Sequence, residues 1–246
     1  MGPREFYASL SSTQDRALAL AREGAPEGTR VVARRQSLGR GRLERAWESP
    51  EGGLYCSIVL SRPRDHPGLL PLTVAAVLAS ALRKEYAVPV VLKWPNDLLV
   101  IEPGRPPRKL SGILTDEVAS PTLGRAMVAG VGLNVRLDRN TLSSSLAERV
   151  AALDEFVTPP PPLEEVEAAV VESALGAAHR LSSDDGARRA RALCRELLYG
   201  VGRPVTVDGR PAGTLEALGD EGELWVTTST DRVAIWAGDV RVEEAL

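Results

Sequence analysis

The sequence is organised around Gln36-Ser-Leu-Gly-Arg-Gly-Arg-Leu-Glu-Arg-Ala-Trp-Glu-Ser-Pro-Glu-Gly-Gly53, which combines arginines, glycines and one tryptophan. Arginine carries a permanent charge and a planar fork of donors that suits carboxylate and phosphate groups. Glycine lets the backbone approach a ligand closely. Because its arginines repel one another and it has little apolar surface to bury, we expect this segment to close over an anionic ligand. The alternative is a solvated linker or a nonspecific nucleic-acid contact.

The overall composition is that of a soluble globular protein. The 246 residues give room for one large domain, or for a large domain and a small one, and 43% of them are hydrophobic. The net charge of -3 provides no general attraction to nucleic acid or membrane, yet six arginines and one acid lie between positions 30 and 45. A local basic patch on a mildly acidic chain favours a small anion over duplex DNA.

The cysteines and the start of the chain indicate a cytoplasmic protein. Cys56 and Cys194 lie in apolar surroundings without CxxC spacing, so we expect both to be reduced core residues. Only His66 and His179 accompany them, which argues against a His/Cys metal site. The first residues lack the apolar core of a signal peptide, and no apolar run reaches membrane-spanning length.

Strands and helices are predicted along most of the chain. Ser12, with Asp15 three residues later, approximates a capping box for a helix that ends near Gly24. Strands are expected at 29–33, 54–60, 88–93, 98–101, 109–115 and 126–135, and helices at 71–86, 163–181 and 187–198.

Two further segments carry local signals. The strand at 88–93 is expected to break at Trp94-Pro-Asn-Asp97 and to resume at 98–101, before the turn Pro103-Gly-Arg-Pro-Pro107 starts the second arm of a hairpin. Ser145 with Glu148 resembles a capping box, which predicts a helix through Leu153.

The spacing of apolar residues changes after Gly200 and Gly202, from a helical pattern to that of short strands. Short strands are expected at 204–207, 213–217, 223–227 and 232–236, separated by Asp-Gly and Gly-Asp turns, as in a small SH3-like β-barrel. We therefore expect an α+β fold with two domains, residues 1–199 and residues 200–246.

Several common catalytic motifs are absent from the sequence. It contains no GxxxxGK[ST], GxSxG or HExxH, and the two GxGxxG candidates, at Gly39 and Gly130, both lack the third glycine. What remains is an ordered set of polar segments: Ser12-Thr-Gln-Asp15, the stretch 36–53, Lys93-Trp-Pro-Asn-Asp97, Lys109-Leu-Ser-Gly112 and Gly130-Val-Gly-Leu-Asn134.

This ordered set resembles the catalytic domain of biotin protein ligases, and the C-terminal strands resemble that family's small domain. The resemblance covers nearly the whole chain from about Phe6. It implies a class II synthetase-like mixed sheet flanked by helices. It also implies a two-step reaction, in which biotin and ATP give biotinyl-5'-AMP and the biotinyl group then passes to a lysine. The implied acceptor is the biotin carboxyl carrier protein domain of a carboxylase, and the implied cofactor is Mg²⁺.

The first step of such a reaction brings two anions together. Two unit charges ~4 Å apart repel by about 4 kcal/mol at an effective dielectric of about 20, and cations must offset that. The resemblance assigns this task to Arg40, Arg42 and Lys109. Arg42 and Lys109 are the implied catalytic residues, with Lys109 at the carboxylate end of biotin.

The resemblance also implies two sets of binding residues. The biotin set comprises Ser12, Thr13, Gln36, Gly39, Arg40, Lys109 and Gly112. The ATP and adenylate set comprises Arg40, Arg42, Trp47, Asn96, Asp97 and Asn134, with Asn134 at the adenine and Asp97 as a candidate Mg²⁺ ligand. Simpler interpretations stand beside these: Ser12 as a helix cap, Asn96 as a turn residue and Trp47 as a local hydrophobic anchor.

The sequence departs from the family pattern in two places. The family loop usually reads Gly-Arg-Gly-Arg-x-Gly-Arg, whereas Glu44 occupies the position of its last glycine. We expect the Glu44 side chain to point away from the phosphates, where it can pair with Arg45 or with an arginine from the preceding strand. The family's acid after the Ile-Leu-Thr strand corresponds to Asp116 or to its neighbour Glu117, and the sequence leaves both open.

Other functions compete with this interpretation. A lipoate or octanoate ligase would use similar chemistry, and a noncatalytic metabolite sensor would bind a ligand without transferring it. Only about ten residues precede Ser12, so we expect no DNA-binding domain and no repressor function. No membrane partner is expected, and exposed sheet edges would allow a homodimer.

Overall fold

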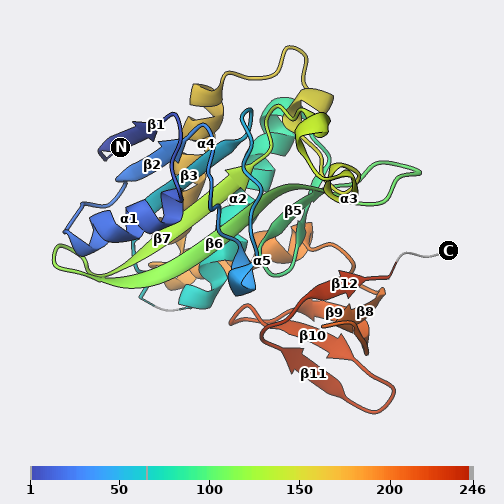
Figure 1. Ribbon diagram of the computed structural model, residues 1–246. Helices are drawn as coiled ribbons and strands as arrows, with labels where there is room; N and C mark the ends of the chain where they lie inside the picture. The colour runs from blue at the N-terminus through green and yellow to red at the C-terminus, as the bar shows by residue number, and fades with distance from the viewer. Residues whose placement is uncertain (1, 65, 244–246) are drawn as a thin grey trace.

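A seven-stranded sheet with the order β1-β2-β3-β7-β6-β5-β4 forms the centre of the computed structural model, which describes residues 2–64 and 66–243 (Figure 1). β1 and β2 are parallel and all other neighbours are antiparallel, so the sheet is mixed, as expected. The strands are β1 (Arg4–Tyr7), β2 (Arg30–Ala33), β3 (Leu54–Ser61), β4 (Val90–Lys93), β5 (Asp97–Val100), β6 (Arg108–Ser120) and β7 (Gly124–Leu133).

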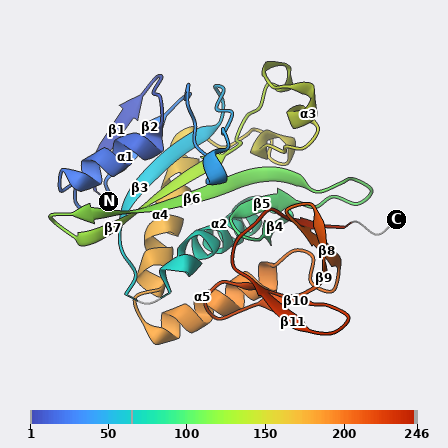
Figure 2. The same cartoon turned by 60° about the horizontal axis from the view of Figure 1, so that its bottom comes forward.

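Helices cover both faces of this sheet, which confirms the α+β class (Figure 2). α1 (Thr13–Arg22) packs alone on one face, where Ala17, Leu18 and Ala21 meet a small apolar cluster. The opposite face carries the larger core, covered by α2 (Leu70–Tyr86), α4 (Leu163–Arg180) and α5 (Asp184–Leu197). Because α1 is short, it leaves part of its own sheet face uncovered.

The N-terminus of α1 is capped as predicted. The hydroxyl of Ser12 accepts a hydrogen bond from the backbone N–H of Asp15 at 3.3 Å. A serine in this position satisfies one of the backbone donors that a helix start leaves free. The cap fixes where α1 begins, and its first turn reaches the uncovered part of the sheet.

The expected interruption of one strand at residues 94–97 is instead a tight hairpin. β4 and β5 pair antiparallel, and Lys93 lies opposite Asp97 across the turn. The Asn96 side chain donates to the carbonyl of Ile113 at 2.7 Å and so ties the turn to β6. Two strands that reverse direction here bring Lys93 and Asp97 side by side, which one interrupted strand would not do.

The predicted helix through Leu153 is wrong. α3 (Ser144–Ala147) is a single turn, and the chain then becomes extended. The backbone N–H of Lys109 donates to Arg149 at 2.8 Å, and the N–H of Ala151 donates to Lys109 at 2.9 Å. This pairing with β6 consumes backbone groups that a longer helix would need. The side chain of Ser145 lies outside the described part of the chain.

The C-terminal residues form a second, antiparallel sheet with the order β11-β10-β9-β8-β12. Its strands are β8 (Pro204–Val207), β9 (Arg210–Leu218), β10 (Leu224–Thr227), β11 (Arg232–Ile235) and β12 (Val240–Val242). Its apolar side chains, such as Leu215 and Val226, belong to the same core cluster as α2 and α4. The indole N–H of Trp94 also donates to the carbonyl of Gly222 at 2.8 Å. The two sheets are thus packed against each other. Among the described residues, none of the helices has the length and apolarity needed to cross a membrane.

Candidate active site

A cavity of about 180 Å³ lies on the part of the sheet that α1 leaves uncovered. Its floor consists of glycines on neighbouring strands: Gly112 of β6 lies directly opposite Gly132 of β7, and Gly130 is two residues away on the same face. Glycines within a strand permit close approach of a ligand to the backbone. The floor can therefore accept a flat molecule.

The arginine loop, residues 36–53, forms the roof of this cavity. Isolated bridges connect Gln36 with Ser49 and Arg40 with Ala46, so the segment folds back on itself. A Cβ atom on Gly39 would lie 2.3 Å from the carbonyl of Trp47, which explains a glycine there. Arg40, Arg42 and Arg45 all line the cavity, whereas the side chain of Glu44 is not among the described parts of the loop.

Trp47 reaches from this roof to the floor. A Cβ atom on Gly132 would lie 2.6 Å from its indole ring, and one on Gly112 would lie 2.9 Å from it. The ammonium nitrogen of Lys109 lies 4.8 Å from the ring centroid, a cation–π contact. The indole N–H of Trp47 is buried and has no hydrogen-bond partner among the described residues. Trp47 thus faces the cavity.

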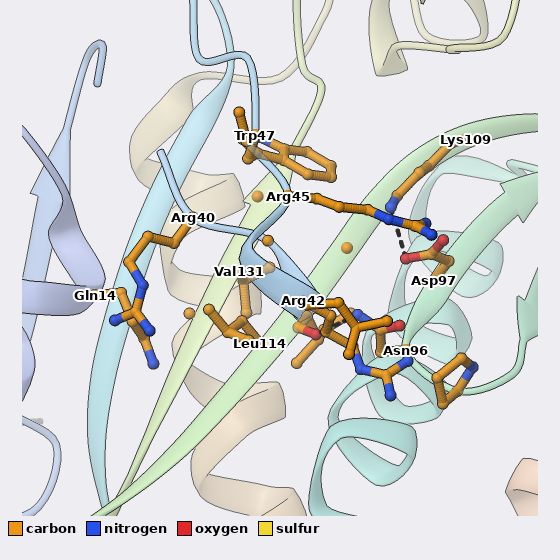
Figure 3. Close-up of a pocket in the computed structure, with 18 of the residues that line it drawn as sticks. Gln14, Arg40, Arg42, Arg45, Trp47, Asn96, Asp97, Lys109, Leu114 and Val131 are labelled. Carbon is orange, nitrogen blue, oxygen red and sulfur yellow. Dashed lines mark hydrogen bonds and ion pairs between the residues drawn. The ribbon is translucent and has the colours of Figure 1, made fainter. Parts of the chain in front are cut away.

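The cationic wall of the cavity consists of Arg42, Lys93 and Lys109. Lys109 Nζ lies 2.7 Å from Asp97 Oδ1, in an ion pair that Figure 3 marks with a dashed line. Burial is the main cause that lowers the pKa of Arg42 and of Lys93, and neighbouring cations add to it, so both pKa values lie below their ordinary values despite the nearby carboxylates. Both cations are therefore only partly compensated, which favours an incoming anion. Lys93 was missed in the sequence, although it begins the Lys93-Trp-Pro-Asn-Asp97 segment.

The C-terminal sheet contributes a carboxylate to the same cavity. Asp239 Oδ2 lies 3.4 Å from Arg45 Nη2 of the arginine loop. Burial raises the pKa of Asp239, but Lys93, Arg45 and Arg241 outweigh it and hold that pKa below its ordinary value. No local pattern in the sequence indicated this residue, because its place depends on how the two sheets pack.

The other end of the cavity carries neutral polar side chains, with Arg40 close by. The backbone N–H and the hydroxyl of Thr13 both donate to Gln36 Oε1, at 2.8 and 3.0 Å. The hydroxyl of Ser57 lies 2.9 Å from that of Thr13. Ser57 was missed, and its signal is a polar residue within the apolar strand 54–60. Ser12, by contrast, is not among the described residues that line the cavity, since its hydroxyl caps α1.

Asn96 and Asn134 occupy different positions. Asn96 lines the cavity at the β4–β5 turn. Asn134 does not line it; its amide donates to the carbonyl of Ala151 at 2.9 Å and to that of Lys109 at 3.3 Å. In this structure Asn134 supports the backbone around Lys109, and its contact with adenine stays a prediction.

Of the two acids left open by the sequence, Asp116 contacts residues that line the cavity, although it does not line the cavity itself. Its carboxylate accepts from Gln14 at 3.0 Å and lies 3.6 Å from Arg40 Nη1. Glu117 instead pairs with Arg62 and Arg125, away from the cavity. No group of three or more acidic, histidine or cysteine side chains converges on a metal position within the described ranges.

Comparison with known proteins places this site in a family. Residues 6–134 match the model of the biotin/lipoate A/B protein ligase family. The chain is 30% identical to a bifunctional ligase/repressor BirA of Bacillus subtilis, over 96% of this chain and 73% of that protein. It is 32% identical to a biotin–[acetyl-CoA-carboxylase] ligase of Mycobacterium tuberculosis, over 96% and 87% of the two chains. The structure of a biotin protein ligase from Aquifex aeolicus in complex with biotin and ATP matches it with a TM-score of 0.82 and 25% identity, over the whole of both chains. The chain therefore belongs to the biotin/lipoate A/B protein ligase family.

Proposed function

We propose that this protein uses ATP to activate biotin as biotinyl-5'-AMP and transfers biotin to a lysine of a biotin carboxyl carrier protein. The observation that carries the proposal is the layout of one cavity, in which a cationic wall faces a neutral polar end across a glycine floor. Biotin has the matching layout, with a carboxylate at one end and a neutral ureido ring at the other. The relatives named for biotin ligation support the same substrate.

Arg42 and Lys109 are proposed to bring the two anions of the first step together. The carboxylate of biotin attacks the α-phosphate of ATP and displaces pyrophosphate. The two anions that must approach each other repel by about 4 kcal/mol at ~4 Å and an effective dielectric of about 20. The lowered pKa of half-buried Arg42 supports this role, because a cation that is partly removed from water binds an anion more strongly than a fully hydrated cation does. Lys109 would exchange Asp97 for the carboxylate of biotin.

The neutral end of the cavity is proposed to hold the ureido ring. Thr13 and Gln36 already form a hydrogen-bonded pair there, and Gly39 and Arg40 lie beside them in the arginine loop. The valeryl arm would cross the floor at Gly112. For Ser12, which the resemblance also implies, the helix cap is the interpretation that the structure favours.

Arg40, Arg42, Trp47, Asn96, Asp97 and Asn134 are proposed to hold the nucleotide. Mg²⁺ usually keeps several waters and binds one or two carboxylates together with substrate phosphates. Asp97 can supply one such carboxylate, since it lines the cavity and its buried Oδ1 contacts Lys109. When bound with ATP, the ion would screen the phosphate charge.

The proposed organisation has two domains, the catalytic residues 1–199 and an SH3-like unit of residues 200–246. Asp239 would then be the contribution of the small domain to the site. Cys56 and Cys194 are both buried and free, which supports a cytoplasmic location. A homodimer stays a prediction.

Mass spectrometry of a carrier domain tests the proposed function. The domain is incubated with this protein, ATP and Mg²⁺, with either biotin or lipoate present. The proposal predicts one added biotinyl group on one lysine and none with lipoate. Labelling with lipoate would indicate a lipoate ligase. Binding of biotin without any ATP-dependent transfer would indicate a noncatalytic sensor.

A further inference from the structure

Gln14, in the first turn of α1, has an amide group whose orientation is fixed by its neighbours. The side chain is buried, with 3% exposure. Its Nε2 donates to Asp116 Oδ2 at 3.0 Å and to the carbonyl of Val128 at 3.1 Å. Both partners are acceptors, so only the nitrogen of the amide can face them. The oxygen must face the other way.

That oxygen points toward the floor of the cavity and has no partner. A Cβ atom on Gly130 would lie 2.5 Å from Gln14 Oε1, and both residues line the cavity together with Ser57. Among the described residues, Gln14 Oε1 is buried without a hydrogen-bond donor. Buried polar atoms in folded proteins are nearly always paired, and an unpaired one needs an explanation.

None of the neighbouring described groups donates a hydrogen bond to Gln14 Oε1. Thr13 gives both of its hydrogens to Gln36 Oε1, so Ser57 must be the donor in its bond to Thr13. Gln36 Nε2 donates one hydrogen to Ser49, which in turn donates to the carbonyl of Trp47. The second Nε2 hydrogen of Gln36 is assigned to none of these bonds. This end of the cavity therefore offers one spare acceptor and one spare donor.

We propose that Gln14 is a specificity-determining residue, which accepts an N–H of the ligand, and that Asp116 positions it. This inference rests on the proposed function. A ureido ring presents an N–H beside a carbonyl, which complements a spare acceptor beside a spare donor. The dithiolane ring of lipoate presents no N–H. A site with a buried acceptor rejects a ligand that leaves that acceptor unpaired, so Gln14 selects biotin over lipoate.

Binding measurements with isosteric ligands test the role of Gln14. The ligands are biotin and its two cyclic carbamate analogues, in each of which a ring oxygen replaces one ureido N–H. Wild-type protein should bind one of the two analogues at least tenfold more weakly than biotin. Gln14→Met removes the acceptor, so that variant should bind biotin more weakly and should discriminate against the same analogue at least fivefold less than wild type does.

Equal binding of biotin and both analogues by wild-type protein would overturn the proposal, and this arm needs no variant. Unchanged discrimination by a folded Gln14→Met protein, checked by thermal melting, would overturn it as well. The titrations contain neither ATP nor carrier domain. They can therefore fail while biotin transfer proceeds, which separates this inference from the proposed function.

Asp116 and Glu117 provide a matched pair for the positioning step. Asp116→Ala removes one of the two acceptors that orient the amide of Gln14, which frees it to turn its nitrogen toward the ligand. We expect the preference for biotin over the weaker carbamate to fall at least threefold. Glu117→Ala, which loses contacts with Arg62 and Arg125, should keep the wild-type preference. A wild-type preference in Asp116→Ala would show that Asp116 does not position Gln14.

Discussion

Lys109 Nζ and Asp97 Oδ1 lie 2.7 Å apart, on the neighbouring strands β6 and β5. The pair forms because the β4–β5 hairpin places Asp97 at the rim of the glycine floor, opposite Gly112. A carboxylate from a ligand would compete with Asp97 for the same ammonium group. In this structure the contact holds Lys109 in place beside the cavity.

Removal of Lys109 tests its proposed role in the first step. Lys109→Ala should lower biotinyl-adenylate formation at least a hundredfold, because the reacting carboxylate loses its cation and Asp97 adds an unpaired negative charge. Lys84→Ala, on the exposed last turn of α2, is the matched control. Pyrophosphate release measures both variants. A near-normal rate in Lys109→Ala would remove Lys109 from the mechanism.

Arg42 should be needed to retain the activated intermediate. The arginine loop covers the cavity. A loop without Arg42 should release biotinyl-5'-AMP, which is a reactive mixed anhydride, to solvent. Arg42→Gly should still make some adenylate and should label lysines of bystander proteins. Mass spectrometry of an added bystander protein measures this, with Arg35→Gly as the control. Labelling confined to the carrier domain, at the normal rate, would contradict the prediction.

The glycine floor should not tolerate a side chain. A Cβ atom at Gly132 would lie 2.6 Å from the Trp47 ring, so Gly132→Ala must displace either the indole or the ligand. We expect the KM for biotin to rise at least tenfold. At Gly68 a Cβ atom would meet its nearest neighbour at an ordinary 3.5 Å, and Gly68→Ala serves as the control. Equal KM values for the two variants would show that the floor is not where biotin lies.

Most of the fold could be predicted from local sequence. The cap at Ser12, the apolar strand 54–60 and the helix after Pro71 all have short-range signals, and the structure confirms them. The helix predicted at 145–153 was wrong because its capping pattern competes with backbone pairing to Lys109, which is distant in the sequence. β1 and β12 were missed for a similar reason, since edge strands of three or four residues carry little pattern of their own.

The site could be predicted only in part. Lys109, Thr13 and Gln36 were predicted through the family resemblance, whereas the residue types of the arginine loop themselves indicate the chemistry. Ser57, Gln14 and Asp239 do not, because a serine in a strand, a glutamine in a helix and an aspartate in a turn are each common. Their roles depend on which other elements lie beside them, and only the packed structure shows that.

The stability of the protein should depend on a buried acid at the edge of the large sheet. Glu167 of α4 contacts Arg4 of β1 and Arg30 of β2, each at 2.8 Å. Burial raises the pKa of Glu167, but the bonds from the two arginines lower it more, so its pKa lies below the ordinary value. Loss of a partner in a buried pair costs about 3–5 kcal/mol, and the partial exposure of Arg4 reduces this to about 2–3 kcal/mol for Glu167→Gln.

The direction in which the stabilisation by Glu167 depends on pH follows from the lowered pKa of its carboxyl group. The stabilisation should be fully present above the unfolded-state pKa of about 4.3 and should be lost as the pH falls through the lower pKa of the folded state. Denaturant unfolding at pH 7 and near pH 3 measures this, with the exposed Glu165→Gln of the same helix as the control. A difference between wild type and Glu167→Gln that is the same at both pH values would contradict the linkage.

ATP–pyrophosphate exchange without any carrier domain tests the central claim most directly. The rate is measured with Mg²⁺ and with biotin, lipoate or no organic acid. Only biotin has both the carboxylate for the cationic wall and the ureido ring for the neutral polar end. The account predicts exchange that requires biotin and disappears in Lys109→Ala. Exchange supported by lipoate at a similar rate, or no biotin-dependent exchange in the wild-type protein, would contradict it.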